Sequence, residues 1–246
     1  MYKLLLAFAI FGHLAADGLS DLRAALGKYA ASSTIRGTLE AQYFGRHGKD
    51  KDATETRGQA FAQIEYGPSG LRAQWGRPLL SQLDRETRAR LRPNPPTNQA
   101  HNALWALEMR KIYSLVNAAE DLSRLLETAT FVSEGAEIYN GSQARALNFS
   151  VASFGDSQRF SRWLREHNST LKIWIASDGS PLGHLQKTTM KFRAFIFITL
   201  EQTREETVTY ANIGDHLVAI RQEESQEFQG GGEYNSSRTL RIFRPS

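Results

Sequence analysis

The chain of 246 residues contains no cysteine. This absence excludes disulfide bonds, thiol catalysis, thiolate metal sites and a lipidated N-terminal cysteine. The fold must therefore be held together by an apolar core, and a chain of this length can bury one that is large enough.

Common catalytic and nucleotide-binding motifs are also missing. The sequence contains no Walker loop and no G-x-S-x-G nucleophile elbow. Gly230-Gly231-Gly232 lacks the spacing of a dinucleotide site, and we interpret it as a hairpin loop. Beyond residue 16 no histidine lies within four residues of another, so no metal site and no cofactor are predicted. These histidines are His47, His101, His167, His184 and His216.

Adjacent carboxylates occur as Glu205-Glu206 and as Glu223-Glu224. Neighbours in a strand point to opposite faces, so we interpret both pairs as solvated hairpin ends and not as acid–base pairs. For the same reason we expect Asp215 and His216 to point apart. The sequence predicts no catalytic residue, and we expect a protein that is not an enzyme.

The formal net charge is +4, and the basic residues are spread along the chain. Nucleic-acid binding would require them to be concentrated on one element with aromatic residues between them, so it is not predicted. The densest group, Arg85, Arg88, Arg90 and Arg92, lies on a predicted helix that also carries two acidic residues. This helix is either a solvated face with internal charge pairs or a contact patch for anionic lipid headgroups or an acidic partner.

Residues 1–16 have the pattern of a secretory signal peptide. Lys3 precedes an apolar run from Leu4 to Ala16, which is too short to span a bilayer as a helix. An uncleaved first helix or anchor is the alternative. We expect cleavage near Ala16, a periplasmic mature protein, and a single domain over residues 17–246.

The first part of the mature chain predicts one helix and three strands. Apolar residues at helical spacing mark Gly18–Ala31 as the helix. Alternation of apolar and polar residues marks strands at Thr34–Arg46 and Thr54–Tyr66, with a third at Leu71–Trp75. These strands are expected to form a meander.

Two helices are predicted next, on either side of a proline-rich break at residues 92–96. The first, Pro78–Leu91, begins with proline, which is favoured at this position. The second is a single long helix over Thr97–Thr128, with an apolar stripe wide enough to cover a sheet face. The stripe consists of Trp105, Met109, Ile112, Val116, Ala119, Leu122 and Leu126.

The second half of the sequence predicts a long antiparallel series of strands. Ala129–Asn140 and Gln143–Ser153 form a hairpin around the turn Asn140-Gly141, and Ser157–His167 is expected to be a short helix. More strands follow from Leu171 to Arg221, and the last strand is Ser237–Phe243.

One segment of this series is unusual. Lys191–Gln202 is predicted to be a single strand with Phe192 and Leu200 on one face and Phe195 and Phe197 on the other. Such a strand requires apolar cover on both faces.

Strands segregated from helices predict an α+β fold, in which a curved, mostly antiparallel sheet, an open half-barrel, is covered on its concave side by helices.

Aromatic residues indicate an apolar cavity between the sheet and the helices. We predict that this ligand-binding cavity is lined by Trp75, Trp105, Trp174, Phe195 and Phe197. Ordinary core packing remains the alternative for each tryptophan.

The chain resembles the LolA-like superfamily of periplasmic lipoprotein carriers and lipid-binding proteins. The likeness lies in the leader, the first helix followed by TIRGTLEAQYFG, the midchain helices and the segment LKIWIASDGSPL. The resemblance implies an open, curved sheet capped by helices that enclose a cavity for acyl chains. It also makes Arg36 a candidate for the arginine that gates ligand entry in the carriers.

Two functional hypotheses follow. In the first, a periplasmic, non-enzymatic protein binds an acyl chain, a lipid or a lipoprotein in a hydrophobic cavity and takes part in envelope lipoprotein or lipid trafficking. In the second, the same fold is an envelope interaction or stress-sensor module whose cavity is filled by its own stripe from Trp105 to Leu126. An envelope protein is then the partner, and peripheral membrane contact is compatible with both hypotheses.

Overall fold

The computed structural model describes residues 17–48, 53–91, 99–152, 164–194 and 198–246. The predicted leader, residues 1–16, lies outside these ranges. The helices of the described part are α1 (Gly18–Leu26), α2 (Arg77–Ala89), α3 (Gln99–Trp105), α4 (Met109–Val116) and α5 (Ala118–Glu127). The strands are β1 (Ile35–His47), β2 (Thr54–Gly67), β3 (Gly70–Trp75), β4 (Ala129–Tyr139), β5 (Ser142–Val151), β6 (Leu164–Ile175), β7 (Pro181–Ala194), β8 (Ile198–Ile213), β9 (His216–Gly230) and β10 (Glu233–Pro245).

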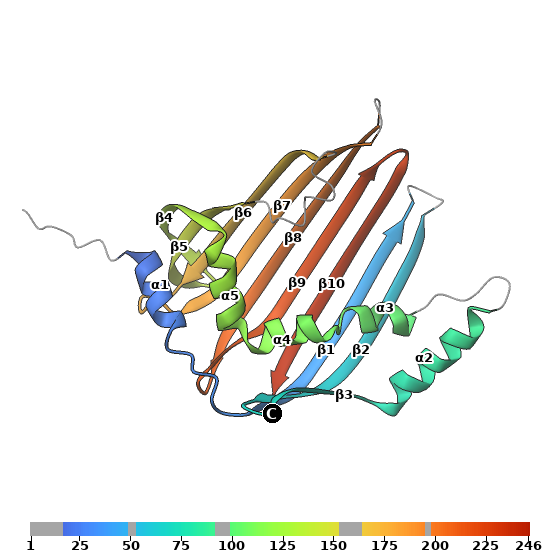
Figure 1. Cartoon of the computed structure of the whole chain (residues 1–246), viewed down its shortest axis with the longest axis horizontal. Coiled ribbons are helices and arrows are strands. Elements are labelled where there is room, and N and C mark those ends of the chain that lie inside the picture. The colour runs from blue at the N-terminus through green and yellow to red at the C-terminus, as the bar shows by residue number, and fades with distance from the viewer. Residues whose placement is uncertain (1–16, 49–52, 92–98, 153–163, 195–197) are drawn as a thin grey trace, which may run out of the picture.

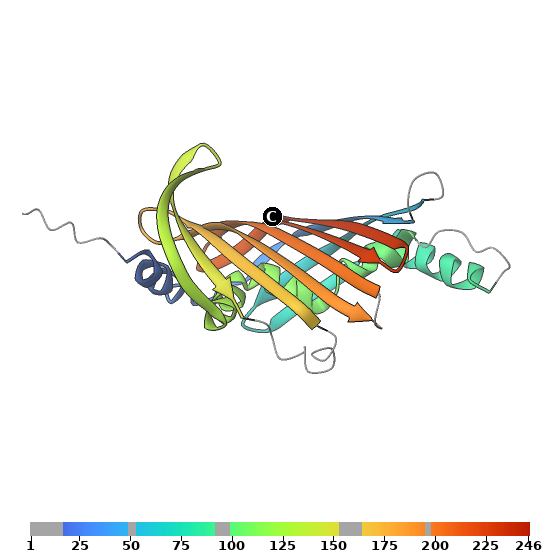
Figure 2. The same cartoon turned by 90° about the horizontal axis from the view of Figure 1, so that it is seen from above.

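All of these strands belong to one sheet, in the order β3-β2-β1-β10-β9-β8-β7-β6-β5-β4. Two antiparallel meanders, β1–β3 and β4–β10, are joined where β1 pairs with β10. The sheet is curved and open, with β3 and β4 at its edges (Figures 1 and 2). The predicted α+β fold with an open, curved antiparallel sheet under helices is confirmed.

Side chains alternate between two faces of the sheet, here called the helix face and the opposite face. The helices α3–α5 cross the helix face from the middle of β1 and β2 toward the end where β1 begins and β10 ends (Figure 1). At this end the strands present buried apolar residues such as Leu39, Ile173 and Phe243, which belong to the main core cluster. The apolar alternation read from the sequence of β1 therefore predicts its burial correctly.

The expected long helix over Thr97–Thr128 is wrong, because the segment contains α3, α4 and α5. The breaks fall after Trp105 and at Asn117, whose ψ of 51° is not helical. A straight helix of this length would extend about 48 Å. The short helices instead change direction as they cross the curved sheet (Figure 1).

The predicted apolar stripe is buried only from Ile112 onward. Ile112, Val116 and Leu122 are fully buried in the core, whereas Trp105 is 76% and Met109 45% exposed. The protein's own helices therefore fill the apolar half of the helix face. No described helix is long and apolar enough to cross a membrane.

The segment Lys191–Gln202 is not a single strand. β7 ends at Ala194, β8 begins at Ile198, and the two pair as antiparallel neighbours, with Phe192 opposite Leu200. The requirement for apolar cover on both faces therefore no longer follows, because it assumes one continuous strand.

Two helix predictions also change at their ends. α1 stops at Leu26, well before the expected Ala31, because Gly27 caps it. Of the helix expected at Ser157–His167, residues 157–163 lie outside the described ranges, and Leu164–His167 is the start of β6. The helix expected at Pro78–Leu91 is confirmed as α2.

Candidate functional site

The structure does not bring the three predicted cavity-lining tryptophans together. Trp75 packs half-buried against the core at the end of β3, and Trp105 is exposed at the end of α3. Trp174 lies on β6, far from β3 in the strand order and on the opposite face. Phe195 and Phe197 lie outside the described residues.

Trp174 is held on the opposite face by contacts with side chains of β4. Its Nε1 donates a hydrogen bond to Glu137 Oε2 at 2.8 Å, and its ring stacks on Tyr139 with centroids 4.9 Å apart. Lys172 forms an ion pair with the same carboxylate at 2.6 Å. These contacts tie β4 to β6 across β5.

Arg36, the candidate gating arginine, also lies on the opposite face. Its Nε forms an ion pair with Glu65 at 2.8 Å on the neighbouring strand β2, and its side chain is 64% exposed. It therefore lies on the other side of the sheet from the helices.

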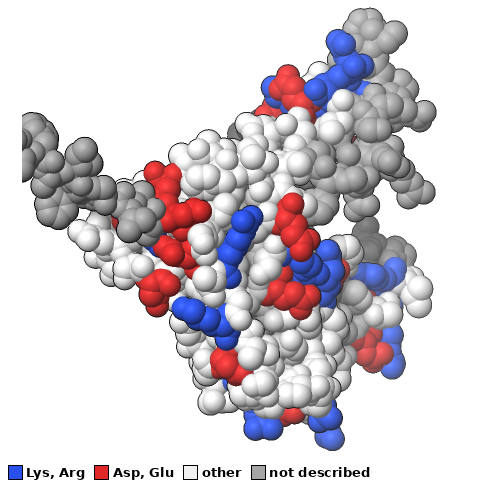
Figure 3. Space-filling view, turned by 60° about the vertical axis from the view of Figure 1, so that its left-hand side comes forward, with Lys and Arg blue, Asp and Glu red and all other residues white. Residues whose placement is uncertain are grey.

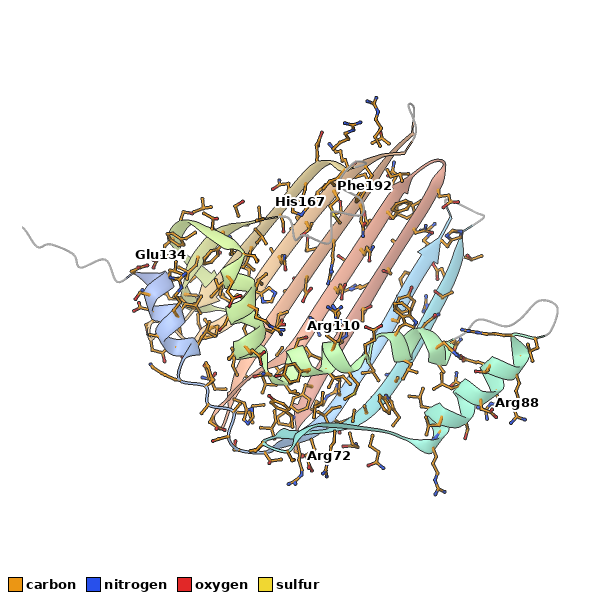
Figure 4. The ribbon with its side chains drawn as sticks, viewed as in Figure 1. Arg72, Arg88, Arg110, Glu134, His167 and Phe192 are labelled. Atoms are coloured by element: carbon orange, nitrogen blue, oxygen red, sulfur yellow. The ribbon has the colours of Figure 1, made fainter. Side chains whose placement is uncertain are left out.

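The described residues instead form a polar pocket on the helix face, of about 520 Å³, between α4, α5 and strands β7–β9. Arg110, Lys111 and Arg124 line it from the helices. Figure 4 shows Arg110 on α4, over the sheet. The strands contribute the floor, whose charged and polar groups are His184, Gln186, Arg204, Glu206 and Gln222.

Two carboxylates meet at this floor. Glu206 on β8 and Glu224 on β9 are directly opposite each other in the register. Like charges in this position destabilise a sheet unless they are compensated. Arg204 compensates them, because its Nη2 lies 3.1 Å from Glu206 Oε2 and 3.0 Å from Glu224 Oε1.

Arg241 on β10 completes the network from beneath α3 and α4, and only 4% of the residue is exposed. Its Nε donates to the carbonyl oxygen of Ala106 at 2.6 Å, and its Nη1 donates to Gln222 Oε1 at 3.0 Å. Nη1 also lies 3.4 Å from Glu224, which Lys111 approaches at the same distance. Arg241 thus links the chain between α3 and α4 to the charged floor.

The interpretation of the two adjacent carboxylate pairs is therefore only half correct. Glu205 and Glu206 do point to opposite faces, as do Glu223 and Glu224. Glu206 and Glu224, however, are not solvated hairpin ends, because they lie within long strands and their side chains are 17% exposed.

Burial acts to raise the pKa of Glu206. His184 in its acid, protonated form, the charges of Lys111 and Arg204 and a hydrogen bond from Gln222 together outweigh burial and lower the pKa of Glu206 below its ordinary value. This carboxylate is therefore ionised at neutral pH. His184, 5% exposed, makes a 2.7 Å hydrogen bond through Nδ1 to the Tyr210 hydroxyl, and burial lowers its pKa although Glu206 opposes the shift.

The lowered pKa of His184 predicts a loss of stability in acid. The unfolded chain takes up this proton near pH 6.5, while the folded protein resists it, so protonation favours unfolding. The free energy of unfolding should fall below about pH 6.5 by at most about 1.4 kcal/mol per pH unit from this group. Urea denaturation between pH 8 and 5.5 should show this slope in the wild type and a smaller one in His184→Gln. Equal slopes would contradict the assignment.

Asp215 and His216 do not point apart as expected. His216 Nε2 lies 3.5 Å from Asp215 Oδ1 and donates to the carbonyl oxygen of Ser33 at 2.9 Å. Hydrogen bonds from the Ser32 and Ser33 side chains and from the Ser32 backbone hold the pKa of Asp215 well below its usual range. These hydrogen bonds join the segment before β1 to the β8–β9 turn. His216 is 1% exposed, so this connection is buried.

Other site types have little support. Within the described ranges no three potential metal ligands converge. The face in Figure 3 carries acidic and basic side chains interspersed, so no field of one sign marks a binding surface there.

The sequence matches no protein-family model and no curated protein. Among solved structures, a DUF1329 family protein from Desulfovibrio piger ATCC 29098 is similar over 91% of this chain and 89% of that chain, with 8% identity and a TM-score of 0.29. MucB in complex with MucA(peri) is similar over 94% of each chain, with 11% identity and a TM-score of 0.25. Likenesses at this level place the chain in no family, and the LolA-like resemblance stays a prediction.

Proposed function

We propose that this protein is a non-enzymatic binding module of the cell envelope whose polar pocket holds a charged segment of a partner protein. The observation that carries the proposal is that α4 and α5 already fill the apolar half of the helix face. The space left between these helices and β7–β9 is lined by charged groups, which favour a polar partner over an acyl chain.

The pocket carries charges of both signs, and Arg110 is the group that favours a carboxylate on the partner. Arg204 and Lys111 are engaged with the floor carboxylates, and Arg124 pairs with Asp121 on α5 at 3.1 Å. Glu127, at the end of α5, also lines the pocket and favours a basic group on the same partner. Arg110 forms no ion pair within the described residues and lines the same pocket. It can therefore pair with a carboxylate of the partner, and complementary charges of this kind provide specificity.

The carboxylates of the floor favour a non-catalytic role. Acid–base hydrolysis by two carboxylates needs one that stays protonated near neutral pH. Glu206 has a lowered pKa, and Arg204 bridges it to Glu224. The arrangement suits fixed charges better than proton transfer.

Placement in the envelope is part of the proposal and rests on the leader pattern of residues 1–16. Fractionation of source cells should recover the protein outside the cytoplasm with the leader removed. Recovery in the cytoplasm would leave the pocket as described but would contradict the envelope partner.

The pocket can be tested by site-specific photo-crosslinking in source cells, with the photoreactive residue at Ser114, which lines it. We expect one partner protein to crosslink and the yield to fall about tenfold or more in Arg110→Glu, a change of about 1.4 kcal/mol. Arg72→Glu is the matched control, since Arg72 is 74% exposed on the opposite face. Equal yields in both variants would contradict the proposal.

An apolar ligand is a second candidate, favoured by a separate group of side chains. Met190, Phe192, Leu200 and Phe228 share the helix face at the end away from α4 and are half-buried. Figure 4 shows Phe192 at this end of the sheet, with His167 nearby. An acyl chain there would gain about 0.8 kcal/mol per buried methylene. Crosslinks to lipid in place of protein, or a bound lipid in the native mass spectrum of protein from its own envelope, would favour this candidate.

A further inference from the structure

The helix α2 stands apart from the rest of the molecule. It projects beyond the β3 edge of the sheet, and its main contact is with α3 (Figures 1 and 2). Its inward side consists of half-buried residues, among them Leu79 and Leu83, and of the buried Glu86. The remaining sides face solvent.

Glu86 fixes the orientation of this helix. Its carboxylate accepts hydrogen bonds from the backbone N–H groups of Ala100 at 2.9 Å and of His101 at 3.2 Å, in the first turn of α3. The Gln82 amide donates to it at 3.0 Å. The acidic charge of Glu86 is therefore used inside the α2–α3 contact.

The outward surface of α2 is strongly basic as a result. Asp84 is its only exposed carboxylate, and it pairs with Arg88 at 3.0 Å. Arg77, Arg85 and Arg90 form no ion pair within the described part of the chain. Four arginines less one exposed carboxylate leave a charge of +3 on this surface.

Two exposed leucines lie among these arginines. Leu80 is 51% and Leu91, just beyond the helix, 89% exposed. At 100° per residue, Leu80 and Leu91 fall about 20° apart on one side of the helix. The paired residues Asp84 and Arg88 lie about 40° and 80° to one side of Leu80, with Arg77 between them at about 60°, and Arg90 lies about 80° to the other side. Figure 4 shows Arg88 directed away from the sheet.

We infer that α2 is a docking helix for the surface of an anionic lipid bilayer. Leucines beside arginines suit the boundary between headgroups and acyl chains, where arginine stems lie along apolar surface and guanidinium groups bind phosphate. A helix that docks into a protein groove presents apolar anchors at i, i+3, i+4 and i+7. The outward side of α2 has two leucines eleven positions apart, whereas a flat lipid surface needs no matching groove.

The inference goes beyond the proposed pocket function and does not depend on it. Crosslinking at the pocket and vesicle binding by α2 are separate measurements on opposite ends of the helical layer, so either can fail while the other holds.

Vesicle co-flotation of the whole chain tests the inference. The wild type should float with vesicles of phosphatidylglycerol and phosphatidylcholine and should be released by high salt. It should not float with phosphatidylcholine alone. Arg77→Gln/Arg85→Gln/Arg90→Gln should lower the partition coefficient roughly hundredfold. Leu80→Ser/Leu91→Ser should lower it as well, because the leucines enter the bilayer boundary.

The matched control is Arg36→Gln/Arg57→Gln/Arg221→Gln, which removes the same charge from the opposite face and should bind as the wild type does. All variants carry the same N-terminus, so an apolar leader contributes equally. Thermal melting confirms that each variant is folded. Equal flotation of the α2 variant and the control would overturn the inference, as would retention on immobilised polyglutamate without vesicle binding, which would indicate an acidic protein partner.

Discussion

Replacing Arg241 with methionine is expected to lower the free energy of unfolding by about 3–5 kcal/mol. The guanidinium group is buried and holds Gln222, Glu224 and the carbonyl oxygen of Ala106 in one network. Its removal leaves a partly buried carboxylate with less compensation and a carbonyl group without a donor. Urea denaturation monitored by tryptophan fluorescence and by circular dichroism measures the change.

Arg238→Met is the control for this prediction. Arg238 lies on the same strand but on the opposite face, is 61% exposed and pairs with Glu223. An exposed pair of this kind contributes about 1 kcal/mol or less. Similar losses in the two variants would show that Arg241 does not hold the network together.

The second large effect is expected for Leu122→Ala on α5. Leu122 is 1% exposed and belongs to the core that fills the apolar half of the helix face. Its truncation should cost about 2–5 kcal/mol and leave an apolar cavity that stays dry. Benzene should then raise the melting temperature of the variant, because a ligand that binds only the folded state stabilises it.

Two comparisons test whether the protein's own helices fill the space over the apolar half of the helix face. Leu80→Ala removes the same atoms from a side chain that is 51% exposed, and little change in stability is expected. The wild type should show no shift with benzene. A shift as large as that of Leu122→Ala would mean that an apolar cavity already exists beside the helices, and the acyl-chain hypothesis would gain support.

The sheet was largely predictable from the sequence because one of its faces is dry over long stretches. In β1, Ile35, Leu39 and Ala41 alternate with polar neighbours, and this period of two predicts both the strand and its buried face. The β4–β5 hairpin was likewise marked by Asn140-Gly141, where both residues have positive φ as a tight hairpin turn requires.

The β7–β8 hairpin could not be recognised because its sequence carries no turn signal. Residues from Arg193 to Thr199 include no glycine, proline, asparagine or aspartate. One part of the prediction, that Phe192 and Leu200 lie on the same face, holds nevertheless. Phe192 and Leu200 share a face in one continuous strand and also as partners across the hairpin.

The break-up of the long helix was hidden by its apolar stripe. Helical spacing continues unchanged from Trp105 through Leu126, so periodicity alone predicts one helix. The curvature of the sheet decides the breaks, and it depends on the pairing of distant strands. Asn117, a poor residue for a helix interior, marks one of the breaks, but Ser114 and Asp121 are residues of the same kind that lie within α4 and α5.

The sequence does not predict the polar pocket, because adjacent charged residues in a strand are typical of solvated hairpin ends. Arg204, Glu206 and Val208 occupy alternate positions of β8 and share the helix face, so the charged residues continue an apolar row. The alternation of Arg204 and Glu206 with Val208 is a signal in the sequence that these charges lie on the buried face. That Glu206 faces Glu224, with Arg241 beneath α3, depends on the register of three strands, which the sequence does not reveal.

The pairing of β1 with β10 has a consequence for the order in which the molecule can form. Gly37 lies opposite Pro245, so the first and last strands of the sheet are neighbours. Every other pair joins strands that follow each other in the chain. A chain made from its N-terminus can form the β1–β3 unit early. The free edge of β1 in that unit stays unpaired until β10 is made. Closing so long a loop is slow, and an uncovered edge attracts other chains. During synthesis and any export, the β1 edge is therefore open to mispairing, and to capture by a chaperone, until β10 has been made and has paired with it.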